Sequence, residues 1–278
     1  MEGLSVVILS YTRSEKIHRM TLDCIRTLIQ SEDFVNTCEL EIILVESNRN
    51  YLTDGFAYPD NVKVIVPAVP FNFHAYLNIG IQEATQTMLA LCNNDLIFHQ
   101  GWYTAIAKVQ AQYPKFKSFC PVQPEENIPS GMFLKGYDVR KHFKGWCLVA
   151  EKILFDKIGL LDEQFDFYYA DDDYAMTLKK HHIPHALVLN SIVEHIGGEN
   201  TATKKEEGAD AFKDLKLQRP DLPTYLYTEG YSWILKNEKL LDGHLKFHKK
   251  WGTIKSLSIK NKLYGMFSKV GLGALVQW

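Results

Sequence analysis

The sequence predicts an α/β fold in which a mostly parallel central sheet is flanked by helices. Three apolar runs, at Leu4–Leu9, Leu40–Val45 and Met88–Asn93, are short and bounded by polar residues, as strands buried on both faces are. Helically spaced apolar residues lie between them, and this alternation is typical of strands that pair through helical crossovers. With 278 residues, 46% of them hydrophobic, the chain is long enough for one large domain with or without an appendage.

The N-terminal half supplies most of this sheet. Ser14 has the character of a helix cap, and Ile17, Cys24 and Leu28 then recur at helical spacing. The elements expected after the strand at Leu40–Val45 are a loop over Tyr51–Asn61, a strand over Val62–Val66, a helix over Phe73–Gln86 and the strand of Met88–Asn93, with a second apolar stretch at Leu96–Phe98. The expected order is strand, helix, strand, strand, helix, strand.

The C-terminal half alternates less regularly. We expect helices over Gly101–Tyr113, over Glu151–Ile158, where Gly159 closes the helix, and from the Asp171–Asp173 run to His181. We expect strands over Lys117–Pro121, Trp146–Val149 and Ala186–Leu189, the last of which leads into Ser191–Glu199. Between them, Pro121–Lys144 is rich in Pro and Gly and is predicted to be a long surface loop that borders a binding site.

The end of the chain predicts a division into two parts. Thr201–Lys216 is highly charged and is expected to form a mobile helix or loop, and Pro220 and Pro223 follow it. We therefore place a first domain at residues 1–228 and a helical, basic, amphipathic appendage at residues 229–278.

Charge and cysteine content exclude several classes of protein. The net charge of −2 gives no global reason to expect nucleic acid or an anionic membrane as partner. The five cysteines are scattered without a CxxC pair, which favours neither a disulfide framework nor a zinc site and suits a reducing, cytoplasmic setting. The predicted strand at Leu4–Leu9 leaves no room for a signal peptide, and no apolar run approaches the roughly 18–20 residues of a membrane span.

Acidic residues follow three of the predicted strands or open a helix beside them. They are Glu46, Asp95 and the pair Asp171 and Asp173. Because ligands bind at the carboxyl ends of strands in open α/β sheets, carboxylates and amides there are placed to hold a divalent cation and the phosphates it bridges. The alternatives are a turn at Asn93-Asn94-Asp95 and simple helix-start chemistry for the Asp run. One Asp suffices for a helix start, whereas three in a row repel one another and indicate a bound metal, proton or hydroxyl.

Several segments, in this order, resemble a known family. They read SVVILSYTR, ILVES, FHAYLNIGI, LALCNNDLIF, GWCLVAEKILFDKIGLLDEQFDFYYADDDYAMTLKKHHIP and VEHIGG. Over residues 4–198 the chain resembles the family 2 glycosyltransferases, which have the glycosyltransferase A-type fold. The resemblance implies inverting, metal-dependent transfer of a sugar from a nucleotide-sugar, with a UDP-sugar favoured, to an acceptor hydroxyl in glycan or glycoconjugate synthesis. It implies Mn²⁺ or Mg²⁺ as cofactor and a glycan, lipid-linked, protein or modified nucleic-acid acceptor.

The resemblance also implies roles for single residues. Catalysis would fall to Asp171 as general base and to Asp173, for which a structural or acceptor-binding role is the alternative. Metal binding would fall to Asp95 and His195, and acceptor binding to Gly145 and Trp146, although Trp146 fits a core position equally well. The nucleotide-sugar would be bound by Ser10, Tyr11, Thr12, Arg13, Glu46, Asn78, Asn93 and Asn94. The chain departs from the family pattern at three positions, where Leu77 replaces an Arg, Asn93 an Asp and Ala170 a Glu.

Other functions stay open on the sequence. A sugar nucleotidyltransferase would want a Gly-rich loop after the first strand, and residues 10–15 contain no Gly. A degenerate transferase that only binds glycans or acts as a scaffold is compatible with the three departures, while the retained Asp95, Asp171 and His195 favour an enzyme. A glycoside hydrolase would leave the features at Tyr11 and Glu46 without a role.

The C-terminal segment His244–Lys269 carries seven lysines and no acidic residue. Apolar residues such as Phe247, Trp251 and Leu263 lie between the lysines. Such a segment can lie peripherally on an anionic membrane at its cytoplasmic face or cover an acceptor. The alternative is a helix packed on the domain with its lysines in water.

Overall fold

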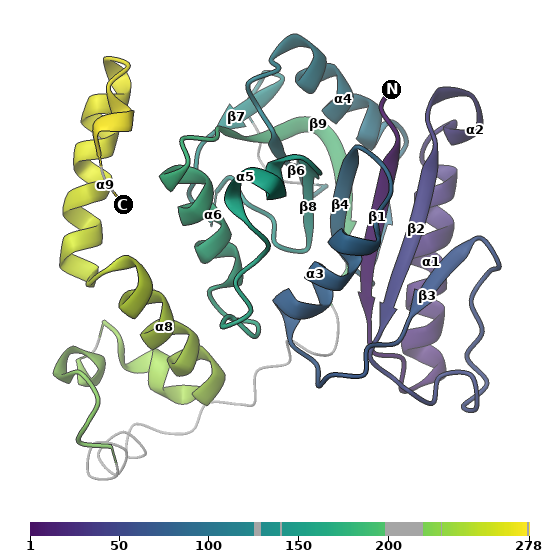
Figure 1. Ribbon diagram of the computed structural model, residues 1–278, viewed down its shortest axis with the longest axis horizontal. Helices are drawn as coiled ribbons and strands as arrows, with labels where there is room; N and C mark the ends of the chain where they lie inside the picture. Colours follow the sequence, from purple (N-terminus) through teal and green to yellow (C-terminus); the bar gives the residue numbers. More distant parts are fainter. Residues whose placement is uncertain (125–128, 140, 198–218, 229, 277) are drawn as a thin grey trace.

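The structure is a computed structural model that describes residues 1–124, 129–139, 141–197, 219–228, 230–276 and 278. Within this part of the chain, nine strands form one sheet with helices on both faces (Figure 1). Eight of them follow the order β3-β2-β1-β4-β8-β6-β9-β5, and β7 pairs with β9. The predicted α/β architecture, a central sheet flanked by helices, is confirmed.

The first half of the sheet is parallel. It consists of β3 (Val62–Ile65), β2 (Leu40–Glu46), β1 (Leu4–Ser10) and β4 (Met88–Asn93), which pair in this order. In register, Ser10 lies opposite Glu46 and Leu9 opposite Asn93. The carboxyl ends of these strands therefore meet at one edge of the sheet, where the polar residues of the site are found.

The second half of the sheet is mixed. β8 (Cys147–Glu151) runs antiparallel to both β4 and β6 (Ser118–Val122), and β9 (His185–His195) is parallel to β6 but antiparallel to β5 (Leu96–Phe98). β9 is much longer than the strand expected over Ala186–Leu189. Its extension carries His195 to the neighbourhood of β5.

One expectation for this half was wrong. Pro121–Lys144, predicted to be a long loop, contains β7 (Phe133–Lys135), which pairs antiparallel with β9. The Phe133 ring packs edge-on against the ring of Phe116. Proline and glycine on both sides of this three-residue strand hid it in the sequence, because so short a run has no readable alternation.

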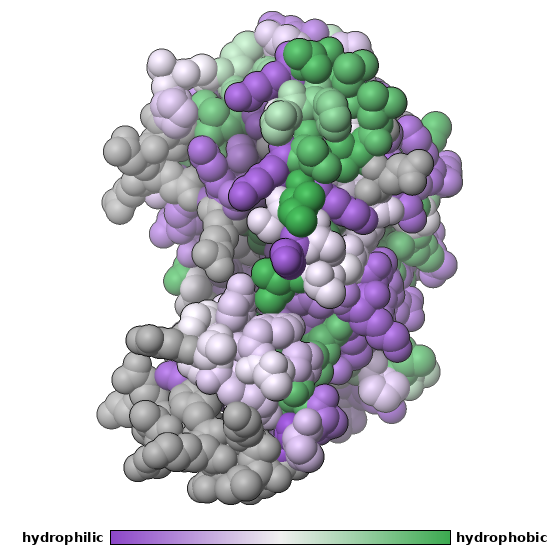
Figure 2. Space-filling view, turned by 90° about the vertical axis from the view of Figure 1, so that its left-hand side faces the viewer, coloured by the Kyte–Doolittle hydropathy of each residue, from purple (hydrophilic) through white to green (hydrophobic). Residues whose placement is uncertain are grey.

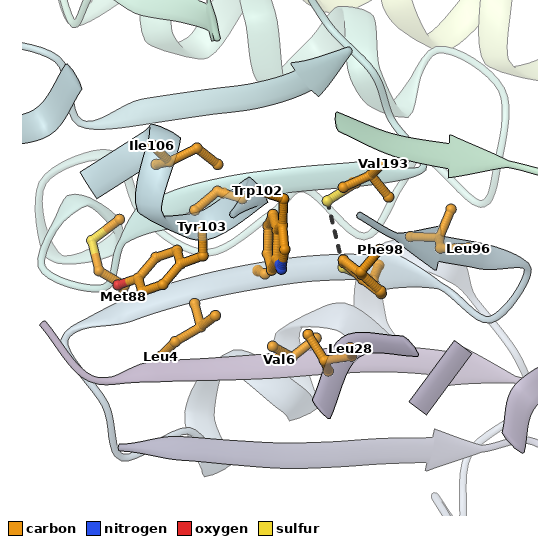
Figure 3. Close-up of a cluster of buried hydrophobic side chains, with 14 of the residues drawn as sticks. Leu4, Val6, Leu28, Met88, Leu96, Phe98, Trp102, Tyr103, Ile106 and Val193 are labelled. Atoms are coloured by element: carbon orange, nitrogen blue, oxygen red, sulfur yellow. Dashed lines mark hydrogen bonds between the residues drawn. The ribbon is translucent and has the colours of Figure 1, made fainter. Parts of the chain in front are cut away.

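The helices cover the two faces of the sheet. α1 (Glu15–Gln30) and α4 (Trp102–Gln112) bury their apolar residues on one face (Figure 3). α3 (Phe73–Glu83), α5 (Leu154–Ile158) and α6 (Ala170–Lys180) pack on the other. Successive residues of β1 alternate between the two cores, as the pleat of a strand requires. A further single turn, α2 (Phe34–Thr37), precedes β2.

Local sequence fixes where the long helices begin. The Ser14 hydroxyl accepts a hydrogen bond from the Ile17 amide, and the Asn72 side chain accepts one from Ala75. Both are N-caps that satisfy amides of the first helical turn. Gly80 lies where α3 crosses β1, and a β-carbon there would overlap the Val7 side chain. Glycine therefore lets α3 approach the sheet closely.

The C-terminal segment packs against the domain through α8 (Glu238–Trp251). Phe247 and Trp251 of α8 join Phe165, Ala170 and Met176 in one buried cluster. A second cluster contains Leu222, Leu226, Ile234, Leu235 and Leu241, and so spans the boundary expected between residues 228 and 229. These residues come from η2 (Thr224–Tyr227), η3 (Ser232–Lys236), the turn before η2 and the start of α8.

The chain then continues into α9 (Ile254–Lys269) and a last turn, η4 (Gly273–Leu275), at the side of the molecule (Figure 1). Lys179 of α6 donates a hydrogen bond to Asn261, and its ammonium lies over the rings of Tyr264 and Trp278. Among the described residues, no helix has the length and apolar character of a membrane span. The expected segment Thr201–Lys216 lies outside the described residues.

Candidate functional site

Asp95 and His195 are brought together although they are 100 residues apart. Asp95 lies in the turn between β4 and β5, and His195 is the last residue of β9. Because β5 pairs with the end of β9, the Nε2 atom of His195 lies 3.2 Å from the Oδ2 atom of Asp95. The Ile196 amide also donates to the Asp95 carbonyl over 3.0 Å. The pair expected to bind metal is therefore assembled by the sheet itself.

The surroundings of this pair suit a divalent cation. Asp95 is buried, and its Oδ1 atom has no hydrogen-bond partner among the described residues. A buried, unpaired carboxylate oxygen is costly unless something outside the chain satisfies it. Carboxylate oxygens are ligands that Mg²⁺ and Mn²⁺ prefer, and a neutral imidazole nitrogen is a common ligand of transition metals. In the described part of the chain no third His, Cys, Asp or Glu completes a cluster with them, so further ligands would have to come from water or substrate.

Trp146 fixes the imidazole of this pair. Its ring stacks on His195 with centroids 5.6 Å apart and planes 13° from parallel. The Trp146 carbonyl accepts a hydrogen bond of 3.0 Å from the Asn93 amide, which holds the Trp backbone against the end of β4. Trp146 is only partly buried. It packs against the hydrophobic core and also lines the site beside His195.

Gly145 connects Trp146 to Asp171. A β-carbon on Gly145 would overlap the Asp171 carboxylate, so the carboxylate lies directly against the glycine backbone. Two consecutive residues thus contact the two candidate centres. Gly145 contacts Asp171, and Trp146 contacts His195, the partner of Asp95. Asp171 and the Asp95–His195 pair are therefore linked through one dipeptide.

Asp171 occupies the first turn of α6 and faces a small pocket. The pocket is also lined by Phe73, His74, Leu77, Phe143 and Tyr174. Burial among these side chains, with the charge of Asp172 as the lesser cause, raises the pKa of Asp171 from 3.8 to about 6. A carboxylate with this pKa is ionised near neutral pH and accepts a proton more readily than an ordinary Asp.

The residues expected to bind the nucleotide divide into buried and exposed ones. Ser10 and Thr12 are buried, their hydroxyls are 3.0 Å apart, and the Asn94 amide points back toward Ser10. Tyr11 and Arg13 are exposed, with the guanidinium 5.7 Å from the centre of the Tyr11 ring. Of this loop, Tyr11 and Arg13 are the side chains that a ligand can reach.

Glu46 is completely buried beneath the same loop. Its Oε1 atom accepts from the amides of Thr12 (3.0 Å) and Asn48 (2.8 Å), and its Oε2 atom accepts from the Tyr58 hydroxyl (2.8 Å). Both carboxylate oxygens of Glu46 therefore accept hydrogen bonds from groups of the protein itself. The structure places Glu46 as a brace for the loop rather than on its open surface.

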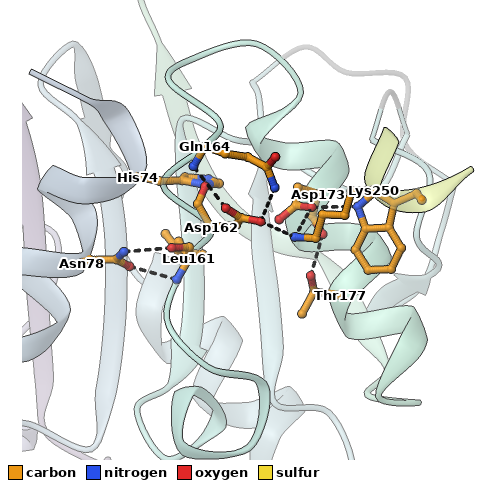
Figure 4. A network of polar contacts seen from close by, with 9 residues as sticks. His74, Asn78, Leu161, Asp162, Gln164, Asp173, Thr177 and Lys250 are labelled. Carbon is orange, nitrogen blue, oxygen red and sulfur yellow. Dashed lines mark hydrogen bonds and ion pairs between the residues drawn. The ribbon is translucent and has the colours of Figure 1, made fainter. Parts of the chain in front are cut away.

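Asn78 and Asn93 also differ from the expectation. The Asn78 side chain is buried and exchanges two hydrogen bonds with the Leu161 backbone, at 2.8 and 2.9 Å (Figure 4). It therefore joins α3 to the segment before α6 instead of facing a nucleotide. Asn93 is half-buried at the end of β4, on the side of Trp146, and this leaves it beside Asp95.

Asp173 was expected to be a second catalytic carboxylate, and its position does not fit that role. It is buried, and its Oδ1 atom accepts from the Trp251 indole and pairs with the Lys250 ammonium, both at 2.7 Å (Figure 4). Lys250 also reaches Asp162 at 2.7 Å. Through these contacts Asp173 anchors α8 to α6. Neighbouring residues of a helix point about 100° apart, so the Asp residues of this run face different surroundings.

Sequence reasoning missed several residues that build the site. Tyr58 donates the hydrogen bond that completes the contacts of Glu46. It lies in a loop, where no periodicity in the sequence distinguishes it. Tyr169 adopts a left-handed backbone conformation (φ 64°) immediately before α6, and its hydroxyl is 2.8 Å from His244 Nδ1. A strained non-glycine residue of this kind requires support from its surroundings, which α8 provides here and which the sequence could not show.

Comparisons with known proteins support the fold. No family model and no curated protein matches the chain. Among solved structures, GalNAc-T7 with UDP, GalNAc and Mn²⁺ superimposes with a TM-score of 0.56 at 14% identity over 98% of this chain. S. aureus TarS does so with a TM-score of 0.52 at 14% identity over 93% of this chain. The chain spans 59% of the GalNAc-T7 chain and 45% of the TarS chain. The expected glycosyltransferase A-type fold is therefore confirmed.

Proposed function

We propose that this protein transfers a sugar from a nucleotide-sugar to an acceptor hydroxyl, with inversion at the anomeric carbon. The observation that carries the proposal is the Gly145–Trp146 dipeptide, in which Gly145 contacts a carboxylate of raised pKa and Trp146 stacks on the imidazole of a metal-type Asp–His pair. Such transfer needs a centre that binds the diphosphate and a base that receives the acceptor proton. The Asp95–His195 pair is the candidate for the first, Asp171 is the candidate for the second, and consecutive residues contact the two.

The donor would bind across the carboxyl ends of β1 and β4. Asp95 and His195 would hold Mn²⁺ or Mg²⁺, and the cation, when bound, supplies charge neutralisation for a leaving diphosphate. Tyr11 offers a ring face for a nucleobase, and Arg13 offers a charge-assisted contact to phosphate. We favour UDP because the structurally similar GalNAc-T7 was crystallised with UDP, GalNAc and Mn²⁺.

The acceptor would bind at the pocket of Asp171. Its carboxylate would take the proton of the acceptor hydroxyl while the acceptor oxygen bonds to the anomeric carbon and the bond from that carbon to the diphosphate oxygen breaks. A single displacement from the side opposite the leaving group inverts the anomeric centre. Gly145 leaves the room for the carboxylate, and Trp146 presents an apolar ring against which a sugar can pack.

Ligand-dependent thermal unfolding tests the donor site. UDP, GDP, CDP and ADP are added to the full chain with and without Mn²⁺. Since a ligand at 100 times its Kd stabilises the folded state by about 2.7 kcal/mol, we expect one nucleotide to raise the melting temperature only with Mn²⁺ present. Asp95→Ala should abolish that rise, and Asp60→Ala, in an exposed loop, is the matched control.

Product analysis tests the chemistry. With the stabilising nucleotide's sugar conjugates and a mixed panel of glycan, lipid-linked and peptide acceptors, proton NMR of the product should show an anomeric configuration opposite to that of the donor. Retention of configuration would contradict Asp171 as the base of a single displacement. Metal-dependent nucleotide binding with no transfer to any acceptor would instead support a degenerate transferase that only binds its ligand.

A further inference from the structure

α9 carries an exposed apolar stripe that the proposed transfer does not use. Ile259, Leu263, Met266 and the adjoining Val270 are 51%, 40%, 66% and 69% exposed, respectively. Figure 2 looks at the side of the molecule on which α8 and α9 lie, and apolar residues gather at the top of that view. Leu272 and Leu275, just after the helix, are exposed as well. Single exposed apolar residues need no explanation, but a continuous row marks an interaction surface.

The stripe lies on the outer side of the helix. At about 100° per residue, these four residues fall within an arc of roughly 60°, on the side away from the buried Leu257. Asn261 and Tyr264, which contact Lys179 of α6, lie on the same side as Leu257. α9 therefore packs on the domain along one face and presents apolar side chains to solvent along the other.

Lysines border the stripe on both sides. The same helical geometry places Lys255, Lys262 and Lys269 along one edge and Lys260 along the other. From Gly243 to the end of the sequence there is no Asp or Glu. In the described part of the chain, none of these four ammonium groups has a carboxylate within ion-pair distance, whereas Lys250 of α8 pairs with Asp162 and Asp173.

We propose that the outer face of α9 docks on an anionic lipid surface, with the stripe entering the boundary between headgroups and acyl chains and the four lysines contacting the lipid phosphates. An apolar row between lysines, parallel to the helix axis, is the arrangement of helices that lie in a membrane interface. A second copy of the chain fits less well, since packing two such faces together would oppose lysines to lysines with no acidic residue to compensate. This proposal concerns a surface apart from the candidate active site.

Vesicle co-sedimentation of the full chain tests the proposal without any activity readout. Sucrose-loaded vesicles of pure phosphatidylcholine are compared with vesicles that contain 30% phosphatidylglycerol. We expect binding to the anionic vesicles that weakens as NaCl rises, because exposed charges are screened. Equal binding to both kinds of vesicle, or binding to neither, overturns the proposal, and self-association through the stripe without vesicle binding assigns the surface to a second copy and overturns it too.

Matched variants separate the two contributions. Replacing Lys255, Lys262 and Lys269 by Gln should weaken anionic-vesicle binding by about tenfold or more, since each lysine near such a surface is worth about fivefold. The triple Lys→Arg variant keeps the charge and should bind like the parent. Met266→Ser with Val270→Ser should also weaken binding, while Val35→Ser with Leu52→Ser, at highly exposed positions outside this segment, should not. Control variants that lose binding as strongly as the α9 variants would overturn the assignment.

Discussion

Replacement of Asp171 by Asn should stabilise the protein while it removes the proposed base. The folded state holds Asp171 with a pKa of about 6 against an ordinary value of 3.8, chiefly through burial. Each pH unit of difference corresponds to about 1.36 kcal/mol, so the ionised carboxylate costs the folded state about 3 kcal/mol. This cost is absent below pH 3.8, grows between pH 3.8 and 6, and is complete above pH 6. Asn has nearly the same shape and carries no charge at any of these pH values.

Urea unfolding of the parent and of Asp171→Asn at pH 4, 5, 6 and 7.5 measures this difference. The gain in free energy of unfolding should be near zero at pH 4, roughly half complete at pH 5 and up to about 3 kcal/mol at pH 7.5. Asp172→Asn, on the same helical turn, removes only the lesser cause of the raised pKa of Asp171, so most of the pH dependence that this residue produces should remain. A gain that does not change with pH, or a loss at pH 7.5, would refute a buried, high-pKa carboxylate.

The same variant links stability to catalysis. If Asp171 takes the acceptor proton, the transfer rate of the parent should rise with pH up to about 6 and then level off, because only the ionised form acts as a base. Asp171→Asn should lose roughly 10²–10⁴-fold in transfer, the usual scale of general-base catalysis, and retain metal-dependent nucleotide binding. An Asp171→Asn variant that transfers sugar at the parental rate would place the base elsewhere.

Three further substitutions probe the contacts around this residue. Gly145→Ala forces a methyl group onto the Asp171 carboxylate, so sugar transfer should fall at least tenfold at a stability cost of about 1–3 kcal/mol by chemical unfolding; unchanged transfer would contradict the contact. Lys250→Met leaves the buried Asp173 without its cation, and urea unfolding at pH 7 should show a loss of about 3 kcal/mol that a double variant with Asp173→Asn partly recovers. Trp146→Leu removes the ring that stacks on the metal-type imidazole, so calorimetry should find weaker Mn²⁺-dependent nucleotide binding with little change in melting temperature.

The parallel half of the fold could be predicted from the sequence because its signals are local. Strands buried on both faces are continuous apolar runs, and β1, β2 and β4 match the expected runs to within one residue at either end. β7 and the extension of β9 could not be predicted. β7 becomes a strand by pairing with Ala186–Val188, and the extension of β9 does so by pairing with β5 and with Val122 of β6, so both depend on distant parts of the chain.

The site shows a similar limit. The pairing of Asp95 with His195 was expected from a motif order, and the sheet brings the two together. The fate of Glu46 was not predictable, because its partner Tyr58 lies in a loop without pattern. The sequence pattern indicates that a carboxylate lies at the end of a strand. Whether that carboxylate is open to a ligand or accepts hydrogen bonds from amides depends on the surrounding backbone.

The Asp171–Asp173 run shows why the end of the chain belongs to the domain. Positions two apart on a helix point about 200° apart, so Asp171 faces the pocket while Asp173 faces α8. Lys250 and Trp251 satisfy Asp173, whereas no such partner pairs with Asp171 in the described part of the chain, and burial raises the pKa of Asp171. A chain cut at residue 228 would lose Lys250, Trp251 and three of the five buried residues of the Leu222–Leu241 cluster. The two carboxylates of this run therefore have different roles. Asp173 is neutralised by Lys250 and attaches α8, whereas Asp171 keeps an uncompensated charge, as a general base requires.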